Sequence, residues 1–538
     1  MATPPAFVRK ATGLLREITA LDGFLMNVGT MNLVWVATSY FWALQLFPGA
    51  HFTFALFLIA GLTLVQALLF ALFTAAMPRS GGEYVFNTRV ISPLVGYAVN
   101  FSMVVWNIFW IAYTSWFLSA FAASPAFTIV GQATGIQLFR ELGEAAARPE
   151  AAFLIGTNNI LVVALLAYVG VRRYFLAMRV AFILGMLGIL SLIAVMALAS
   201  REAFVAGFNS FAGPGAYERT LTMARELGIE ASAPSLFSAQ TLFALAVAFQ
   251  PIGFAVWSSY AAGEIRHAMS LKVHLLSMAG SVLFITVFLA LVGELSYRIF
   301  GYEFITASAW LFYNAPDKSI LAIPPSTQLF ASLLTNNVVA NLLMAIGFIA
   351  WAFLYAPQSM LMVTRCMLAW SLDRVAPERL SRVGGRYGTP YNAIVLSTVL
   401  ALVLLWIFVF PPFNIFSTYG LNAFIGGGTI TWLAVGVAGI LYPYRPKTRA
   451  HYEASPASRY RVGGVPVISI AGAITAAYMA LITYLYMARP EFGILSVPST
   501  AFLVGVYLLG IALYYAHKVY YRRRGIAVDL AFKEIPPE

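Results

Sequence analysis

The sequence predicts an all-α polytopic membrane protein with roughly twelve transmembrane helices. Hydrophobic residues make up 61% of its 538 residues and charged residues only 10%, whereas soluble domains carry about 25% charged residues. Apolar stretches of about 20 residues, long enough to cross a bilayer, recur along the whole chain. Lys and Arg residues gather in alternate connections between these stretches, which is typical of a chain that crosses a membrane repeatedly.

The apolar stretches give the predicted spans. Their approximate limits are 20–47, 52–77, 93–124, 152–171, 174–199, 236–262, 271–300, 327–371, 391–410, 413–441, 465–487 and 497–521. The first stretch follows basic residues, as a signal peptide would, but it is too long for the apolar region of one. We therefore expect it to be retained as a helix. The eighth stretch is longer than one span and is expected to continue as a helix into the cytoplasm.

The distribution of basic residues predicts the orientation of the chain. With the N-terminus in the cytoplasm, most of the 33 Lys and Arg residues fall on the cytoplasmic side. This asymmetry satisfies the positive-inside rule and predicts a plasma-membrane protein with both termini in the cytoplasm. It also accounts for the net charge of +12 without a nucleic-acid partner, so the lipid bilayer is the expected partner. The sequence does not distinguish a monomer from a homodimer.

The spans and loops divide the chain into consecutive parts. These are a cytoplasmic N-tail (1–19), spans 1 to 5 (20–200), an extracellular loop (201–235), spans 6 to 10 (236–441), a cytoplasmic loop (442–464), spans 11 and 12 (465–521) and a cytoplasmic C-tail (522–538). The extracellular loop contains Gly213-Pro214-Gly215 and a mixed-charge stretch with helical spacing. That spacing predicts a short surface helix.

Two spans contain clusters that predict breaks in the helix. The clusters are Gly29, Thr30, Met31 and Asn32 in span 1, and Phe249, Gln250, Pro251, Ile252 and Gly253 in span 6. Taken singly, helix packing through small and polar residues or a simple proline kink explains each cluster equally well. Together they are more informative, because spans 1 and 6 open two groups of five. Interruptions at corresponding positions of two halves are the best sequence pointer to a binding site between inverted repeats.

Three further residues are candidates for a binding site. Asn107 is an isolated polar residue in the middle of span 3, Trp257 follows the cluster of span 6, and Ser417 lies near the start of span 10. A buried polar group within a membrane needs a partner, although aromatic residues of a span more often serve packing or the interfacial belt. The glycine run Gly426–Gly428 is predicted to allow close helix packing.

Three passages resemble the amino acid–polyamine–organocation (APC) superfamily of secondary transporters. Residues 77–84 read Met-Pro-Arg-Ser-Gly-Gly-Glu-Tyr and resemble its Pro-x-Ser-Gly-Gly-x-Tyr loop after span 2. Residues 364–377 with 387–393 resemble its cytoplasmic signature after span 8, and residues 445–466 resemble its loop before span 11. The resemblance implies an amino acid permease with a LeuT-like five-plus-five inverted repeat and broken helices 1 and 6. It also implies transport of amino acids or related amines by alternating access.

The chain departs from the family pattern in helices 1, 5 and 6. Leu33-Val34-Trp35 occupies the place of the family's second glycine-rich turn in helix 1. Either the break lies one turn earlier, at Gly29–Asn32, or recognition of a carboxylate differs. The spacing from Gln250-Pro251 to Glu264 also differs from the family. Proton-coupled relatives can carry a Lys in helix 5, where this chain has only Arg179 near the cytoplasmic end.

The acidic residues of the spans bear on the substrate. Asp22, Glu264 and Glu294 are predicted near span ends, and a site for arginine or a polyamine needs a buried carboxylate. The sequence therefore favours a neutral, apolar amino acid, with amines and polyamines as the alternative. We expect the substrate carboxylate to meet N–H groups at Thr30–Asn32 and its amine to meet carbonyls at Phe249–Pro251. Side-chain contacts are predicted from Met31, Ile252 and Trp257.

Three charged residues near the predicted cytoplasmic face, Arg79, Glu83 and Glu264, are candidates for a gate. Glu264 or Glu83 is expected to pair with basic residues there, and the alternative is a solvated loop charge. The coupling ion, sodium or a proton, stays open; sodium would need oxygen ligands from the broken helix 1 and from helix 8.

Other functional classes are less well supported by the sequence. The chain has one cysteine and five histidines, and it shows no nucleophile or metal-binding motif. We therefore expect neither an enzyme nor a cofactor. A membrane sensor or an ion channel on the same scaffold stays as an alternative, because it would have the same spans. Saturable substrate flux that is stimulated by substrate on the opposite side would distinguish a transporter from both.

Overall fold

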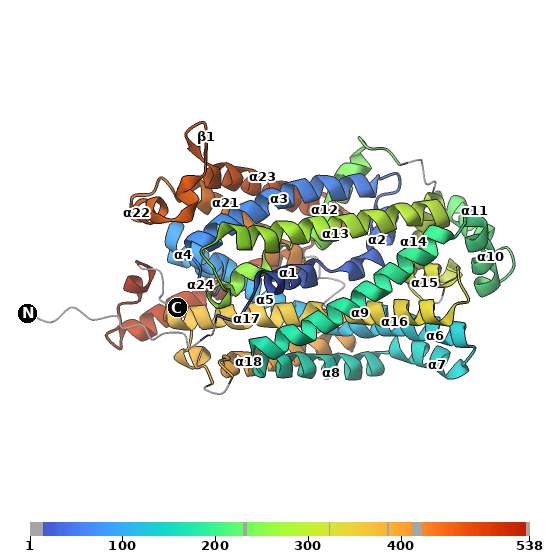
Figure 1. The fold of residues 1–538 in the computed structure, drawn as a ribbon, viewed down its shortest axis with the longest axis horizontal. Helices are drawn as coiled ribbons and strands as arrows, with labels where there is room; N and C mark the ends of the chain where they lie inside the picture. Colours follow the sequence, from blue (N-terminus) through green and yellow to red (C-terminus); the bar gives the residue numbers. More distant parts are fainter. Residues whose placement is uncertain are drawn as a thin grey trace, which may run out of the picture.

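The computed structural model describes residues 14, 16–229, 234–321, 323–384, 387–410 and 422–533. Almost all of the described elements are helices that run side by side along the long axis of the molecule (Figure 1). The described strands are β1 (Arg461–Val462) and β2 (Val465–Pro466), which form an antiparallel hairpin. The predicted site residue Ser417 lies within 411–421, outside the described residues.

Nine helices of the described part are long and apolar enough to cross a membrane. They are α3 (Phe52–Ala76), α5 with α6 (Pro93–Thr134), α8 (Pro149–Tyr168), α9 (Val171–Leu198), α13 (Leu271–Phe300), α16 with α17 (Val338–Leu372), α18 (Tyr391–Val409), α23 (Val467–Ala488) and α24 (Val497–Arg522). A bent pair of helices would give a tenth span. It consists of Ile425–Leu441, whose last part is α21 (Ile430–Leu441), and of α22 (Pro446–Ala454), and the two are bent by 81° relative to each other. An all-α polytopic membrane fold is thus confirmed.

Two of the predicted spans are broken. The first consists of α1 (Ala20–Met31), a 3₁₀ turn (Leu33–Val36) and α2 (Ser39–Leu46). The sixth consists of α12 (Ala239–Ile252) and a run of turns and 3₁₀ segments that reaches Glu264. Because each helical piece is shorter than the roughly 20 residues needed to cross a bilayer, neither qualifies as a spanning helix by itself.

The shorter helices gather at the two ends of the bundle. At one end lie α10 (Arg201–Ala212), α11 (Ala216–Glu226), α14 (Tyr302–Asn314) and α15 (Thr327–Ser332), at the right of Figure 1. At the opposite end lie α4 (Glu83–Val90), α22 and the hairpin. The remaining short helices are α7 (Gln137–Ala146) and α20 (Asn422–Phe424). The loop predicted to hold one surface helix holds two, because a glycine-containing turn at positive φ, Gly213–Gly215, separates α10 from α11.

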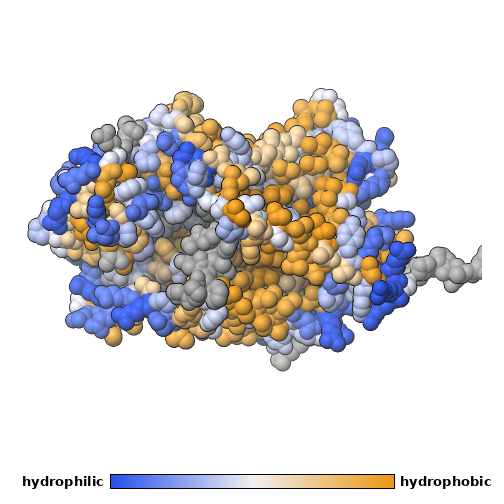
Figure 2. Space-filling model, turned by 180° about the vertical axis from the view of Figure 1, so that it is seen from behind, coloured by the Kyte–Doolittle hydropathy of each residue, from blue (hydrophilic) through white to orange (hydrophobic). Residues whose placement is uncertain are grey.

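Large apolar side chains cover the middle of the molecular surface. Figure 2 shows hydrophobic residues over the centre of the visible face and hydrophilic residues at its two ends. The exposed side chains include Leu154 and Leu165 of α8, Val403 of α18 and Leu508 of α24. Soluble monomers rarely expose apolar surface over so wide an area, so this band is the surface expected to face lipid.

Glycines set the closest helix contacts. A Cβ atom on Gly188 of α9 would lie 2.6 Å from the Cα of Gly347 on α16, so the two backbones touch where both side chains are absent. Small residues let membrane helices approach in this way. The predicted glycine run also serves packing, since a Cβ on Gly427 would lie 2.7 Å from the Cβ of Trp106 on α5.

This packing yields a stability prediction. Gly188→Leu should lower the melting temperature of the purified protein in detergent, because overpacking a tight contact costs about 1–3 kcal/mol. Gly505→Leu is the matched control, since a Cβ atom added at Gly505 of α24 would have no neighbouring atom within 4 Å. Equal melting temperatures of the two variants would contradict the assignment of this contact.

Candidate functional site

The break in helix 1 is built around Asn32. This residue has a φ of 64°, in the left-handed region that few non-glycine residues adopt. Its Oδ1 accepts a hydrogen bond from the Val34 N–H at 2.8 Å, and its Nδ2 donates to the carbonyls of Gly29 at 3.1 Å and Trp351 at 2.8 Å. The side chain thus holds the turn and ties it to α16. Helix α1 ends at Met31, so the break begins only at the last residue of the predicted range Gly29–Asn32 and continues through Thr38.

The break in helix 6 lies further along the chain than predicted. Helix α12 continues through Pro251 to Ile252, and the Gly253 N–H donates to the Phe249 carbonyl at 2.8 Å. The irregular backbone extends from Gly253 to Glu264 rather than across Phe249–Gly253. The predicted amine contact at Phe249 needs correction for the same reason, because this carbonyl already accepts a bond within the chain.

The two breaks are bonded to each other. The Asn27 amide donates to Ser258 Oγ at 3.2 Å and accepts from the Ser258 N–H at 2.9 Å. The Thr30 hydroxyl lies 3.0 Å from the carbonyl of Phe254, to which it donates. All four residues are buried. The polar residues of span 1 therefore serve first to join the broken segments of helices 1 and 6.

An aromatic cavity of about 340 Å³ lies beside the broken segments. Its lining consists of Trp35, Thr38, Trp42, Trp110, Tyr113, Trp116, Phe117, Phe121, Gln250, Tyr313 and Phe424. These residues come from the first break and the α2 that follows it, from α5 and the π-helical turn after it, and from α12, α14 and α20. Ligand pockets typically enclose about 300–1,000 Å³, so the cavity has the size expected for a small-molecule site.

Three polar donors of this lining have no hydrogen-bond partner among the described residues. They are the Nε1 of Trp35, the Oγ1 of Thr38 and the Nε2 of Gln250, all of them buried. Thr38 is also the residue that precedes α2, and its side chain makes no capping bond to that helix. Because unsatisfied buried polar groups are costly, three of them around one cavity point to a ligand that accepts hydrogen bonds.

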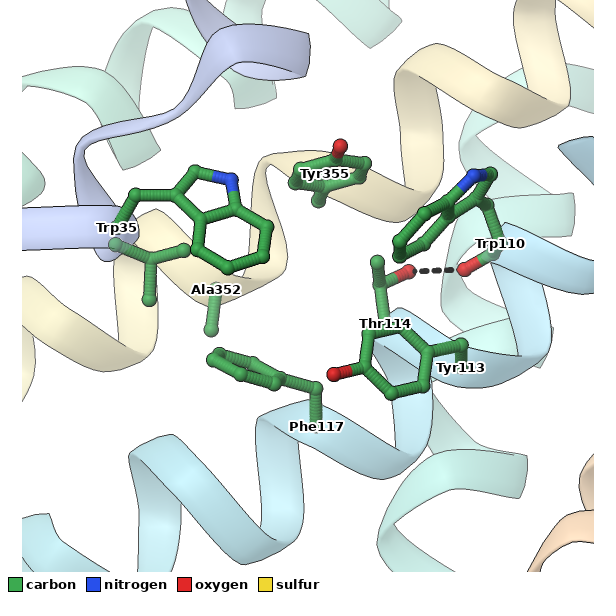
Figure 3. A pocket seen from close by; sticks show the side chains of 8 residues that line it. Trp35, Trp110, Tyr113, Thr114, Phe117, Ala352 and Tyr355 are labelled. Atoms are coloured by element: carbon green, nitrogen blue, oxygen red, sulfur yellow. Dashed lines mark hydrogen bonds between the residues drawn. The ribbon is translucent and has the colours of Figure 1, made fainter. Parts of the chain in front are cut away.

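A smaller void shares part of the lining of the cavity. This void has a volume of about 10 Å³ and is lined by Val34, Trp35, Trp110, Tyr113, Thr114, Phe117, Ala352 and Tyr355. Figure 3 shows the rings of Trp35, Trp110, Tyr113, Phe117 and Tyr355 around this void. A volume of this size holds about one water molecule. Four of these rings, those of Trp35, Trp110, Tyr113 and Phe117, line both the void and the cavity.

The predicted site residues are only partly brought together. Of those that the structure describes, Gln250 lines the cavity. Gly29 lies against the side chain of Gln358, and Asn107 donates to the carbonyl of Met103 on its own helix. Trp257 packs its ring against Phe254 at 5.5 Å between centroids. The other predicted residues of the two clusters, Met31, Phe249, Pro251, Ile252 and Gly253, are buried in the bundle.

Sequence reasoning misses most of the cavity lining. Trp110, Tyr113 and Trp116 follow one another at helical spacing on α5, and this pattern is more typical of packing or an interfacial belt. Trp42 and Tyr313 come from α2 and α14, which are far apart in sequence. The available signal is the density of Trp and Tyr in span 3, and it does not distinguish a pocket from a packed interface.

Two ion pairs, one of them fully buried, lie at the opposite end from α14. Arg365 of α17 donates to both carboxylate oxygens of Glu264, at 2.7 and 2.8 Å, and both side chains are 1% exposed. The Arg179 guanidinium donates to Asp22 at 2.7 Å. Glu264 therefore does pair with a basic residue, as predicted. Its partner, Arg365, comes from α17.

Residues 80–84 are buried and residues 78 and 79 half-buried, so Glu83 is not the solvated loop charge that is the alternative to a gate. Glu83 is 0% exposed, and its Oε1 accepts a hydrogen bond from Asn100 Nδ2 at 2.7 Å. The Gly81 N–H donates to the Tyr260 carbonyl at 2.9 Å, and a Cβ on Gly82 would lie 2.7 Å from the Tyr260 ring. The glycines thus allow this loop to pack tightly against the broken part of helix 6. Arg79 donates to the carbonyl of Pro78.

Comparison with known proteins agrees with this architecture. The family model described as amino acid permease matches residues 19–512, which confirms the resemblance to the APC superfamily. A search of curated proteins gave no match. The family indicates a multi-pass membrane transporter of amino acids or amines, and not an enzyme. Because the match runs from the start of α1 into α24, the chain belongs to the amino acid permease family.

Proposed function

We propose that this protein is a secondary active transporter that moves a neutral, apolar amino acid across the membrane by alternating access. The spans would form a twelve-helix bundle with a five-plus-five inverted repeat. Support comes from the breaks in spans 1 and 6, which lie at corresponding positions of the two groups of five. Transporters of this kind build their substrate sites from such discontinuous helices.

The observation that carries the proposal is the aromatic cavity with its three unpartnered donors. The substrate carboxylate would lie at the start of α2, next to Thr38 and Trp35. The N-terminus of a helix attracts anions, because its first N–H groups are unpaired and its dipole is positive there. This placement replaces the predicted one at Thr30–Asn32, because those residues end α1, and the Asn32 N–H is bonded to the Val28 carbonyl at 2.8 Å.

The remaining lining suits an apolar side chain. Rings such as Trp110, Phe117 and Phe424 supply a large hydrophobic surface, and the residues lining the cavity include no Asp or Glu. An organic amine is the second candidate, because a cation within about 6 Å of a Trp or Tyr ring is attracted by its π electrons. The three donors favour the amino acid, because a simple amine offers no acceptor for them.

The positions of the cavity and of the ion pairs support a state in which the site is accessible from the α14 end of the bundle and closed at the opposite end. Trp42 of α2 and Tyr313 of α14 place the cavity toward the α14 end, whereas the Glu264–Arg365 and Asp22–Arg179 pairs lie at the opposite end. The predicted topology puts that opposite end in the cytoplasm. Opening toward the cytoplasm would then require these ion pairs to separate, while the substrate's own contacts compensate part of that loss.

A transport assay tests the proposed function directly. Purified protein in proteoliposomes should take up radiolabelled neutral apolar amino acids in a saturable manner, and unlabelled substrate on the opposite side should accelerate that flux. The panel should include amines and polyamines. Preferential uptake of amines would favour the second candidate. Flux that neither saturates nor responds to counter-substrate would instead support a channel, and substrate binding without any flux would support a sensor.

The proposed carboxylate contact predicts the effect of removing one hydroxyl. Thr38→Val should raise the KM for the transported amino acid by roughly 10- to 100-fold, because a hydrogen bond to a charged group contributes about 1.5–3 kcal/mol. The amide of the same amino acid should be a poor substrate of both proteins. Thr286→Val is the matched control, since the Thr286 hydroxyl donates to Val282 on its own helix at 2.7 Å. An unchanged KM in Thr38→Val would place the carboxylate elsewhere.

The Glu264–Arg365 pair predicts a coupled response. Glu264→Gln and Arg365→Met should each reduce uptake, because removing one partner of a buried ion pair costs about 3–5 kcal/mol. The double variant Glu264→Gln/Arg365→Met should recover part of the activity, since no uncompensated charge is left. Uptake per amount of folded protein measures the coupling. A double variant whose loss equals the sum of the two single losses would show that the pair does not act as a unit.

A further inference from the structure

Glu83 is a buried carboxyl group that the substrate site does not use. It begins α4, and its Oε2 atom is buried without a hydrogen-bond partner among the described residues. Burying an ionised carboxylate costs several kcal/mol unless a cation or hydrogen bonds compensate it. Asn100 supplies one such bond, to Oε1, at 2.7 Å. Burial therefore disfavours the ionised form of the carboxyl, while the hydrogen bond from Asn100 favours it.

The titratable groups that face Glu83 are neutral acids. Tyr260 faces it from the broken part of helix 6 and, through its hydroxyl, partly offsets the effect of burial on the pKa of Glu83, and Cys366 faces it from α17. The Cys366 thiol lies 3.4 Å from Asn100 Nδ2, and Trp370 Nε1 donates to Asn100 Oδ1 at 2.6 Å. Neither titratable neighbour supplies a positive charge. Burial raises the pKa of Glu83 to about 7.

The basic residues of the elements around α4 are directed elsewhere. Arg89, on α4 itself, pairs with Asp373 at 2.6 Å. Arg445, at the start of α22, donates to the carbonyls of Val90 and Ile91 at the other end of α4. His451 of α22 lies 2.5 Å from the hydroxyl of Tyr442. On α21, the side chain near this group is the uncharged Trp432, which lies against Tyr260.

The Glu83 carboxyl is linked to the part of the bundle expected to move. The loop before α4 is bonded to the broken part of helix 6 through the Gly81 N–H and the Tyr260 carbonyl, and Ser80 pairs with Ala261. Tyr260 lies four residues before Glu264 of the buried ion pair. Any opening that displaces the segment from Gly253 to Glu264 would therefore change the surroundings of Glu83 and admit water to it.

We propose that Glu83 binds the proton that couples substrate transport to a pH gradient. The inference rests on the proposed transport function and names its coupling ion. In the state with the ion pairs closed, the carboxyl holds the proton on Oε2. When the helix 6 segment moves and water reaches the group, the proton passes from Oε2 to water on the side that has opened. Return to the first state requires a proton to be taken up again.

The first break offers a second reason to favour a proton over sodium. Carbonyls freed by a helix break are the usual ligands of a coupling cation. Here the Asn32 amide already donates to the carbonyls of Gly29 and Trp351, which come from the broken helix 1 and from α16. A sodium ion at these oxygens would have to compete with an amide held by the chain.

The test compares wild-type protein with Glu83→Gln in proteoliposomes that contain a trapped pH indicator. Wild-type protein should show proton entry on addition of substrate, and its KM should rise tenfold per pH unit above pH 7, as expected for one required proton. Glu83→Gln should keep exchange of substrate for substrate. It should lose both the proton flux and the pH dependence. Glu294→Gln, on an exposed position of α13, is the control and should behave as wild type.

A second variant keeps the inference testable if Glu83→Gln does not fold. Asn100→Leu removes a hydrogen bond that lowers the pKa of Glu83, so the midpoint of the pH profile should move to higher pH. Substrate-induced proton flux in Glu83→Gln, an unmoved midpoint in Asn100→Leu, or uptake driven by sodium alone would each overturn the assignment of the proton to Glu83. Those results would leave transport itself established, whereas an absence of saturable flux in wild-type protein would overturn the proposed function.

Discussion

The hydrogen bonds between the two broken helices are the constraint on which the rest of the arrangement depends. A helix that breaks at membrane depth leaves backbone groups that lipid cannot satisfy. Here Asn27 bonds reciprocally with Ser258, and Thr30 bonds with the carbonyl of Phe254. Side chains of helix 1 thus satisfy backbone groups that the break in helix 6 leaves without a helical partner. Because these bonds join α1 to the segment after α12, the two broken helices are expected to move together.

This pairing explains where a substrate can bind. The polar side chains at the end of α1 are occupied, so the unpaired donors lie beyond the break, at Trp35 and Thr38, and across the cavity at Gln250. A carboxylate has favourable electrostatics only there, since α1 presents its C-terminal end to the break and α2 presents its N-terminal end. A substrate that fills the space among the aromatic rings would displace water from these donors, which strengthens each polar contact that it makes.

The sequence predicts the spans and the existence of both breaks, because hydrophobic length and interrupting polar residues are local properties. It places the second break too early, since Pro251 removes only its own N–H and α12 continues past it until Gly253. The aromatic cavity could not be predicted, because Trp42, Trp110 and Tyr313 meet only in the folded bundle. The sequence also leaves two interpretations of Glu83, a gate residue or a solvated loop charge. The glycines beside it suggest a turn, and nothing local shows that Tyr260 packs onto that turn.

The charges at the end opposite α14 show why one carboxyl differs from the others. Asp22, Glu264 and Asp373 each have an arginine partner, so their ionised forms are compensated while that end stays closed. Glu83 has the polar neighbours Asn100 and Tyr260 but no arginine partner among the described residues. Closing the bundle therefore leaves three carboxylates paired with arginines and the fourth buried without one. A movement that separates the ion pairs also hydrates Glu83, and in that way one conformational change would release both the inner gate and a proton.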